Sequence, residues 1–364
     1  MGYAERKNMF EQIEQLRKRP LIAYVTSIRP NLSGQMAGDS IDHIIEQIQH
    51  IPQDNREIDF LIISNGGDPI TALRIISLLR ERFDRVSVLL PYVAYSAATI
   101  LSLGADEIVM HPYSNLGPVD PQLTVSRQAD DGRASQLQFS SEDIRNYIDF
   151  VKTDVGITDQ NHLTSAFNAL AKEVGPIPIG SAKRSQQLSL SLSIKMLETH
   201  MEDKSKATAI AKALNTAYYH HGYAVSRSEA KNMGLNVVSP DSCLESLMWE
   251  IWKDYSIEMK CGQEFNIVAS IMMDPIAKAW MNSVNVVNIP ANTPPQIAQN
   301  IIANAAQATH VITQQPPIHI DELIATIESS RSAVSVHTSF SIIYWRDANM
   351  ALAFNATAYS EGWK

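Results

Sequence analysis

The stretch Pro91-Tyr-Val-Ala-Tyr-Ser96-Ala-Ala-Thr99 follows the apolar run Val86 to Leu90 and opens a segment of small residues. Another apolar run, Phe60-Leu-Ile-Ile-Ser64, ends upstream in the glycine pair Gly66-Gly67. Short apolar runs closed by glycine or proline are typical of buried strands. Two such strand ends can converge on one point, one with the Ser96 hydroxyl and the other with exposed backbone N–H groups. Those are the groups that attack on an acyl carbon requires.

Strands and helices are expected to alternate around this junction. Apolar runs predict the strands, and apolar residues at helical spacing predict the helices between them. The expected strands are Leu21 to Thr26, Phe60 to Ser64, Val86 to Leu90 and Glu107 to Met110. The expected helices are residues 3–18, a helix that Asp39 or Ser40 caps, a helix that begins at Pro69, and residues 96–103. This order predicts an α/β fold of βα units, with a largely parallel sheet and right-handed crossovers.

The middle of the chain predicts a polar loop followed by helices. Residues 126–140 are rich in Gln, Asp, Arg and Ser and are expected to form an exposed loop. Residues 141–174 have helical character, which the stretch Gly175-Pro-Ile-Pro-Ile-Gly180 is expected to break. Further helices are expected at residues 185–200, 203–217 and 228–234, the last one ended by glycine.

The C-terminal part of the chain differs from the rest, and we place a domain boundary before it. The α/β unit is expected to span residues 1–257, and residues 258–364 to form an α+β region of unknown role. That region contains a proline-broken polar stretch at residues 290–295 and a helical segment that ends near Ala308. Strands are expected at residues 334–344 and 351–359, around a hairpin turn at residues 346–349.

The composition excludes several classes of protein. The net charge of −9 argues against a dedicated nucleic-acid binder, because phosphate contacts need clustered lysine and arginine. Two cysteines make neither a disulfide framework nor a zinc site, and no cluster has metal-ligand spacing, so no metal or other cofactor is expected. The N-terminus lacks the apolar region of a secretory signal, and no apolar run approaches the ~18 residues of a membrane span. We therefore expect a cytoplasmic protein without a membrane anchor.

Ser96 and the glycine pair are weak signals when each is taken alone. A serine before a helix is most often an N-cap, and a glycine pair usually marks a turn. A phosphate-binding loop is another interpretation, but no Gly-Lys-Ser/Thr follows the glycines and no dinucleotide fingerprint matches. Their weight comes from the motifs around and after them, which are Ala94-Tyr-Ser-Ala-Ala-Thr99, Gly104-Ala-Asp-Glu-Ile-Val-Met110 and Leu116-Gly-Pro-Val-Asp-Pro-Gln122.

Together with Ser64-Asn-Gly-Gly67, these motifs resemble the serine dehydrogenase proteinase family. That family is a branch of the Clp-protease and signal peptide peptidase A superfamily, which shares the crotonase-like fold. The segment from His221 to Leu235 resembles the family's closing element, so the similarity covers about residues 5–238. The resemblance implies a crotonase-like (ClpP-like) α/β core and a serine peptidase that acts on peptide or protein substrates.

The resemblance implies roles for individual residues. Ser96 matches the nucleophile, and the backbone N–H groups of Gly67 and Ala97 match the oxyanion hole. The residues themselves agree, because Gly67 has no Cβ and Ala97 lies in a first helical turn, where amides are unpaired. The substrate is expected to be an extended peptide that lies beside Gly66 and Asp68.

The proton acceptor for Ser96 is left open by the sequence. A Clp-type protease has a histidine downstream of the nucleophile, but the corresponding stretch here reads Pro118-Val-Asp120-Pro121. Asp120 is expected either to orient a base or to cap this loop. Signal peptide peptidases use a downstream lysine instead, for which Lys183 is the best candidate. The other candidates are Lys152, Lys172, His220 and His221, the last two lying about where the Clp-type triad acid would fall.

The sequence also departs from the superfamily. Asn65 stands where proline is common and Ala98 where glycine is common, which narrows the site or restricts its backbone. The alternatives are therefore a catalytically weak or inactive scaffold or sensor and, ranked last, an acyl-CoA enzyme of the crotonase type. Relatives form rings, so a homo-oligomer is expected, with Leu247-Met-Trp249 and Ile271-Met-Met273 as candidate contacts or as core.

Overall fold

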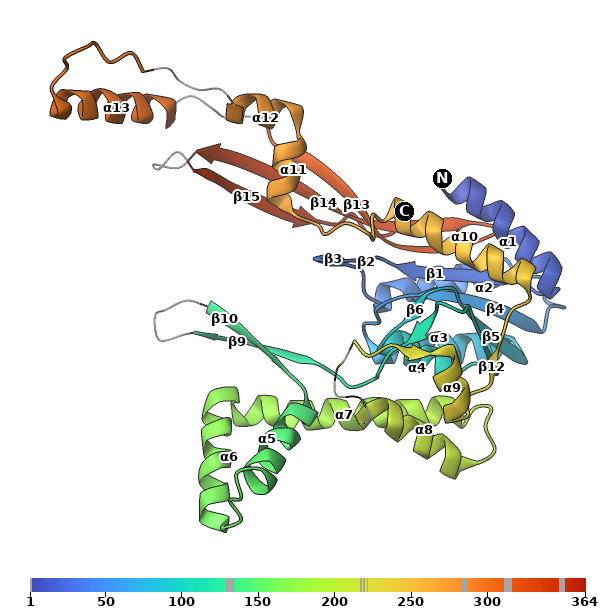
Figure 1. Cartoon of the computed structure of the whole chain (residues 1–364). Helices are drawn as coiled ribbons and strands as arrows, with labels where there is room; N and C mark the ends of the chain where they lie inside the picture. Colours follow the sequence, from blue (N-terminus) through green and yellow to red (C-terminus); the bar gives the residue numbers. More distant parts are fainter. Residues whose placement is uncertain are drawn as a thin grey trace.

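The computed structural model describes residues 2–128, 134–216, 218, 220, 222–282, 287–310, 316–346 and 351–364. Its centre is an eight-stranded mixed sheet in the order β12-β7-β5-β4-β1-β13-β14-β15 (Figure 1). The strands from β12 to β1 are parallel, and three antiparallel strands extend the sheet beyond β1. The expected α/β architecture with a parallel sheet is therefore confirmed for the first part of the chain.

The parallel half of the sheet follows the sequence expectation closely. Its strands are β1 (Leu21–Thr26), β4 (Glu57–Ile63), β5 (Arg85–Leu90), β7 (Glu107–Met110) and β12 (Val237–Val238). The helices of this half are α1 (Tyr3–Arg17), α2 (Ile41–Gln49), α3 (Pro69–Arg82), α4 (Ala97–Leu103), α7 (Pro176–Leu197), α8 (Lys204–Thr216), α9 (Arg227–Met233) and α10 (Ser242–Glu258).

Helices cover both faces of these strands. Side chains alternate along a strand, so Ile22 and Tyr24 of β1 pack in the layer with α2, α3, α4, α7 and α8. Ala23 and Val25 pack in the opposite layer with α1 and α10, which lie on the other side of the sheet in Figure 1. Burial on both faces explains why the strands are continuous apolar runs rather than alternating ones.

The C-terminal strands continue this sheet and share its core. They are β13 (Ile318–Ser329), β14 (Ala333–Arg346) and β15 (Leu352–Tyr359). β13 runs antiparallel beside β1 and places Ala325 and Ile327 in the core of the parallel half. The boundary expected at residue 257 falls near the end of α10, while the segments on either side of it form one sheet. No strand was expected at residues 318–329, which form β13.

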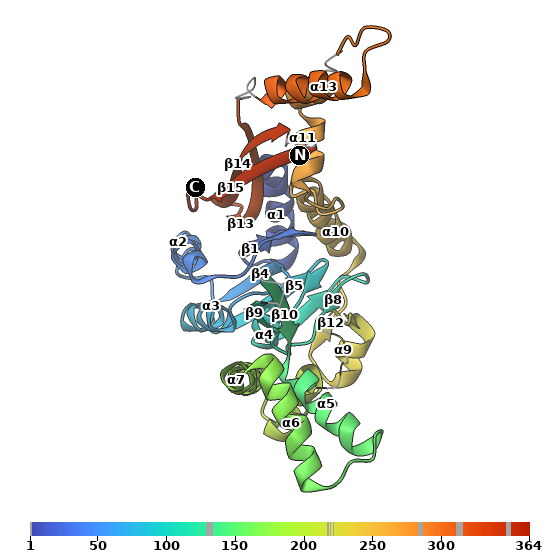
Figure 2. The same ribbon diagram turned by 90° about the vertical axis from the view of Figure 1, so that its left-hand side faces the viewer.

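A buried ion cluster links helices α1 and α10 to strand β13. Arg6 of α1 is 1% exposed and donates to Glu328 of β13 at 2.8 and 2.7 Å and to Asp254 of α10 at 2.5 Å. Glu258 of α10 also accepts from Arg6. Of the C-terminal helices, α11 (Ile267–Met273) and α12 (Pro275–Asn282) pack on β14 through Ile271 and Ala277, whereas α13 (Pro295–His310) projects beyond the sheet (Figure 2).

In the middle of the chain one sequence expectation is wrong and another holds only in part. Residues 126–140 were expected to be a loop, but β9 (Leu123–Gln128) and β10 (Ala134–Phe139) form an antiparallel hairpin. Apolar residues at every second position, such as Leu123 opposite Phe139, give these strands one shared face. The expected helix break is present at Gly175, where φ is 94°, but it is shorter than residues 175–180. After α5 (Ser141–Thr153), α6 (Gln160–Val174) ends at Gly175, and α7 begins at Pro176 because proline suits a first helical turn.

Candidate active site

Ser96 occupies a strained position at the start of α4. Its backbone angles are φ 52° and ψ −118°, and a non-glycine residue with positive φ is uncommon. Neighbours hold this conformation, since the Ser96 N–H donates to Pro118 O at 3.2 Å and the Ser96 carbonyl accepts from Ile100 N–H at 3.1 Å. Within the described part of the chain, the Ser96 side chain makes no capping hydrogen bond. The half-buried hydroxyl is therefore not engaged as an N-cap, and strain of this kind is concentrated at functional sites.

A buried threonine fixes the loop behind Ser96. The Thr99 hydroxyl lies 2.6 Å from Ala94 O and 2.9 Å from Gly117 O, and it accepts from Gly117 N–H at 3.2 Å. A Cβ on Gly117 would lie 2.5 Å from the ring of Tyr95, so a larger residue does not fit there. The Leu116-Gly-Pro motif thus packs directly against the junction that carries Ser96.

The glycine pair touches the same junction from the neighbouring strand. A Cβ on Gly66 would lie 2.8 Å from the Cβ of Ser96 and 2.9 Å from the Ala97 nitrogen. Gly66 and Gly67 have φ values of 100° and 148°, which residues with a side chain rarely adopt. The expected convergence of the two strand ends is therefore present in the structure, at van der Waals distance.

The backbone of Met36 holds the glycine pair through hydrogen bonds to Gly66 and Asp68. The Met36 N–H donates to Gly66 O at 2.8 Å, and the Met36 carbonyl accepts from Asp68 N–H at 2.9 Å. A Cβ on Gly67 would lie 2.3 Å from Met36 O. Met36 is fully buried, and these contacts fix the direction in which the Gly67 amide points. No sequence signal identified Met36, because its role depends on a contact between segments far apart in the chain.

Two backbone amides beside Ser96 are unpaired. Among the described residues, neither the Gly67 N–H nor the Ala97 N–H has a hydrogen-bond partner. The Ala97 amide belongs to the first turn of α4, where the helix dipole favours a negative charge. Two such donors next to a hydroxyl can stabilise the oxyanion of a tetrahedral intermediate, and each is typically worth about 2.7–4 kcal/mol.

Ser96 and Gly67 line a pocket of about 310 Å³, which we call the Ser96 pocket. Helix α7 and the loop after Gly117 form its opposite wall, where the Ser189 hydroxyl donates to Val119 O. Its other lining residues are Asp68, Pro69, Ile100, Pro121, Gln122, Leu123, Ser185 and Leu188. The volume is that of a small ligand site and suits one side chain of a bound peptide.

The expected peptide-binding residues have different places. Asp68 is exposed and lines the Ser96 pocket, and its carboxylate also caps α3 by accepting from Ile70 and Thr71 N–H. Gly66 is buried, and its carbonyl is bound to Met36. Of the two residues, Asp68 is thus the one that lines the Ser96 pocket.

The candidate bases that the structure describes do not line this pocket. No lysine or histidine of the described ranges is among its lining residues. Lys183 is exposed on α7, with its Nζ 3.5 Å from Gln186 Oε1, and Lys152 and Lys172 are exposed on α5 and α6. His221 lies outside the residues that the structure describes. Exposed His220 accepts from Gly222 N–H at its Nδ1.

Asp120 and His111 are buried polar residues. Asp120 accepts from Gln122 Nε2 at 3.0 Å, and Gln122 lines the Ser96 pocket. His111 stacks on Trp249, with ring centroids 4.9 Å apart, and burial lowers the pKa of His111 below its ordinary value. His111 therefore belongs to the core at the end of β7.

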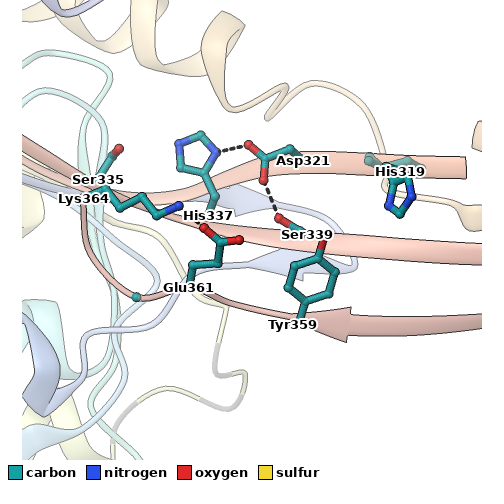
Figure 3. Close-up of a pocket in the computed structure, with 10 residues that line it drawn as sticks. His319, Asp321, Ser335, His337, Ser339, Tyr359, Glu361 and Lys364 are labelled. Carbon is teal, nitrogen blue, oxygen red and sulfur yellow. Dashed lines mark hydrogen bonds and ion pairs between the residues drawn. The ribbon is translucent and has the colours of Figure 1, made fainter.

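A second pocket, of about 420 Å³, lies on the C-terminal strands, and we call it the β14 pocket (Figure 3). Asp321 accepts from the Ser339 hydroxyl at 2.7 Å and forms an ion pair with His337 Nδ1 at 2.7 Å. The hydrogen bond from Ser339 lowers the pKa of Asp321. Glu361 and Lys364 pair with each other beside these residues.

The described residues contain neither a metal-ligand cluster nor a helix that could span a membrane. No group of three or more His, Cys, Asp or Glu side chains in the described ranges is placed to hold a metal ion. No helix in those ranges combines the length and the apolar character needed to cross a bilayer.

Residues 32–138 match the family model of the ClpP-like SDH-type serine proteinases. This segment contains Gly67, Ser96 and Ala97, and the match confirms over its length the resemblance and the ClpP-like fold that the motifs indicated. The match supports a serine peptidase. It does not include Lys183 or His221.

Curated relatives and solved structures are also similar to this chain. An uncharacterised protein of Methanocaldococcus jannaschii is 26% identical over 197 residues, which are 54% of this chain and 58% of that protein. A second uncharacterised protein of the same organism is 34% identical over 82 residues, or 22% of this chain and 28% of that protein. The chain therefore spans little more than half the length of the first relative and under a third of the second.

Mutant forms of the 1510-N membrane-bound stomatin-specific protease are among the similar solved structures, one of them in complex with a substrate peptide. Their sequences are 18% and 16% identical to this chain. The alignments cover 62% of this chain and 81% and 77% of those chains, with a TM-score of 0.34 in both cases.

Proposed function

We propose that this protein is a serine peptidase in which Ser96 attacks the carbonyl carbon of an extended peptide. The observation that carries the proposal is the contact between strained Ser96 and the Gly66-Gly67 pair, beside two unpaired amides. The family match over the same segment supports it. The chemistry needs no metal or organic cofactor.

The proposed reaction follows from the groups around Ser96. The Ser96 oxygen bonds to the carbonyl carbon while its proton passes to a base, and the carbonyl electron pair moves onto oxygen. The Gly67 and Ala97 amides donate to that oxyanion. The intermediate collapses, the peptide nitrogen leaves with a proton, and water then hydrolyses the acyl-enzyme.

Two residues are candidates for the base that takes the proton from Ser96. Lys183 is the first candidate, because it lies on α7, the helix that forms the pocket wall. His221 is the second candidate, and Asp120 is proposed to orient the base. Each assignment requires the base to approach Ser96 from beyond the described pocket walls.

The remaining expectations concern assembly and location, and they stay proposals. We retain a cytoplasmic homo-oligomer as the working picture. Of the candidate contacts, Leu247 and Met248 are buried in the core, whereas Met272 and Met273 on α11 are 44% and 82% exposed. The α11 segment is therefore the better candidate for a contact between copies.

A second candidate function is a peptide-binding scaffold without catalytic activity. The observation that favours it is the absence of any lysine or histidine from the described lining of the Ser96 pocket. The acyl-CoA alternative has no comparable observation in its favour.

Hydrolysis of a fluorescein-labelled unfolded protein tests the proposal. Wild type is expected to release labelled peptides, Ser96→Ala to release none, and Ser339→Ala, the control on β14, to match wild type. Lys183→Met and His221→Gln then identify the base by which of them loses activity. Equal hydrolysis by wild type and Ser96→Ala would contradict the peptidase assignment, and a wild type that binds this substrate without cutting it would favour the scaffold.

A further inference from the structure

Residues 360–364 form a tail that returns from β15 to the body of the protein. Ser335 N–H donates to Lys364 O and Lys364 N–H donates to Ser335 O, both at 2.8 Å. Trp363 forms an antiparallel bridge with Val336 of β14. Figure 3 shows Lys364 and Glu361 of this tail beside His337 of β14. The tail is therefore attached to the C-terminal strands by its backbone.

Trp363 attaches the tail to the parallel half of the molecule. Its indole N–H donates to Asp39 Oδ2 at 2.9 Å. The ring is half-buried, with its centroid 5.4 Å from that of His43 on α2 and 6.5 Å from that of Tyr24 on β1. Trp363 thus joins strands at the end of the chain to a turn near its beginning.

The turn that contains Asp39 lies next in the chain to Met36, the residue that hydrogen-bonds to both sides of the glycine pair. Asp39 lies in the short 3₁₀ helix η1 (Gly38–Ser40), three residues after Met36. Ser40 stiffens the turn, because both its N–H and its hydroxyl donate to Ala37 O, at 3.1 and 2.7 Å. Asp39 therefore belongs to a hydrogen-bonded turn that starts next to Met36, whose carbonyl lies against Gly67.

Strand β13 makes a second contact with the segment that contains Met36 and Asp39. The register of β13 shifts at Ile324, between Leu323 and Ala325, and Ile324 O accepts from Ser27 N–H at 2.7 Å. A Cβ on Gly34 would lie 2.3 Å from this carbonyl. Residues 27–40, which include the short strands β2 (Ile28–Arg29) and β3 (Leu32–Ser33), are thus held at two points by the C-terminal region.

We propose that Trp363, through Asp39, is a positioning residue for the Gly67 amide. The C-terminal region holds residues 27–40 in place, and Met36 of that segment sets the direction of the Gly67 N–H. The proposal gives residues 258–364 a role at the Ser96 pocket without requiring any of them to touch the substrate. It rests on the proposed function for its catalytic consequence, while its structural consequence stands by itself.

Hydrogen exchange tests the structural consequence in the full chain. In Trp363→Ala and Asp39→Ala, protection of the Met36 and Asp68 amides is expected to fall about tenfold, the effect of one lost hydrogen bond. Trp345→Ala is the matched control, since Trp345 is an exposed tryptophan of the same sheet. Circular dichroism confirms folding, and Asp39→Ala carries the test if Trp363→Ala does not fold. Unchanged protection in the folded variants would overturn the proposal.

Covalent labelling of Ser96 by a fluorophosphonate tests the catalytic consequence. The labelling rate is expected to fall in Trp363→Ala and Asp39→Ala, to fall less in Trp363→Phe, which keeps the ring but loses the N–H, and to stay unchanged in Trp345→Ala. Equal rates in wild type and Trp363→Ala would overturn the positioning role. If amide protection falls in the variants but no protein is labelled, wild type included, the contact from Trp363 to the Met36 segment is supported and the peptidase assignment is contradicted.

Discussion

The Ser96 pocket and the β14 pocket both contain a serine and a carboxylate, yet their backbones differ. Ser96 has a positive φ and stands beside two unpaired amides. Ser339 lies in a regular strand, paired with Asp321 on one side and Tyr359 on the other, and its hydroxyl donates to the Asp321 carboxylate. The β14 pocket has the His337–Asp321 pair that the described walls of the Ser96 pocket lack.

The backbone, rather than the titratable side chains, therefore distinguishes Ser96, the proposed nucleophile, from Ser339. Ser339 lies in a strand that is paired on both sides, so its backbone amides bond to the neighbouring strands rather than to an oxyanion. At the start of α4 the backbone amides next to Ser96 are unpaired and can serve as such donors. This difference can be tested by substituting Arg6, which joins the two parts of the sheet, and Gly67 and Thr99, which support the backbone around Ser96.

Loss of Arg6 is expected to have the largest effect on stability. Arg6→Met leaves Glu328 and Asp254 buried without their cation and should destabilise the protein by about 3–5 kcal/mol. Urea unfolding should show a single transition at lower urea, because the cluster joins α1, α10 and β13. Arg56→Met, which removes the exposed pair with Asp84, should cost about 1 kcal/mol or less. Two separate transitions would mean that the two pockets sit on independent units.

Gly67→Ala is expected to affect both stability and labelling. The new Cβ would meet Met36 O at 2.3 Å, at a φ of 148°. The strain should cost about 2–3 kcal/mol in the free energy of unfolding and slow phosphonate labelling. Gly180→Ala is the control, because nothing lies within 4 Å of its Cβ position on α7, and it should be neutral or stabilising. A wild-type labelling rate in Gly67→Ala would show that the Gly67 amide does not act at Ser96.

Thr99→Val is expected to have the smallest effect of the three. It removes the hydroxyl that contacts Ala94 O and Gly117 O in the core and should cost about 1–2 kcal/mol. Thermal unfolding measures the change, with the exposed Thr164→Val on α6 as the control. No difference between the two variants would indicate that the junction does not depend on this side chain.

Local patterns predicted most of the parallel half of the fold. The strands at residues 21–26 and 107–110 were predicted to the residue, because both are short apolar runs. The strands at residues 334–344 and 351–359 are β14 and β15, and the turn expected between them lies mostly outside the described ranges. The pairing of β13 with β1 was not predictable, because it joins segments about 300 residues apart in the sequence. The β9–β10 hairpin was missed because its polar composition hid the alternation of Leu123 and Val125.

The candidate site was predictable in its backbone part only. Gly67, Ser96 and Ala97 belong to contiguous motifs, and the structure brings the Gly66-Gly67 pair against the Ser96 junction. Met36 and the α7 residues Ser185, Leu188 and Ser189 reach the site by tertiary packing, for which the sequence holds no local signal. The base depends on a side chain from elsewhere in the chain or assembly, and spacing alone does not select it.

Mapping a fluorophosphonate adduct by mass spectrometry tests the central claim most directly. The native protein is treated with the reagent and digested, and the modified peptide is sequenced. We predict a single adduct on the Ser96 hydroxyl, absent from Ser96→Ala and retained in Ser339→Ala. An adduct on Ser339 or on another serine, or equal labelling of wild type and Ser96→Ala, would contradict the assignment of Ser96 as the nucleophile.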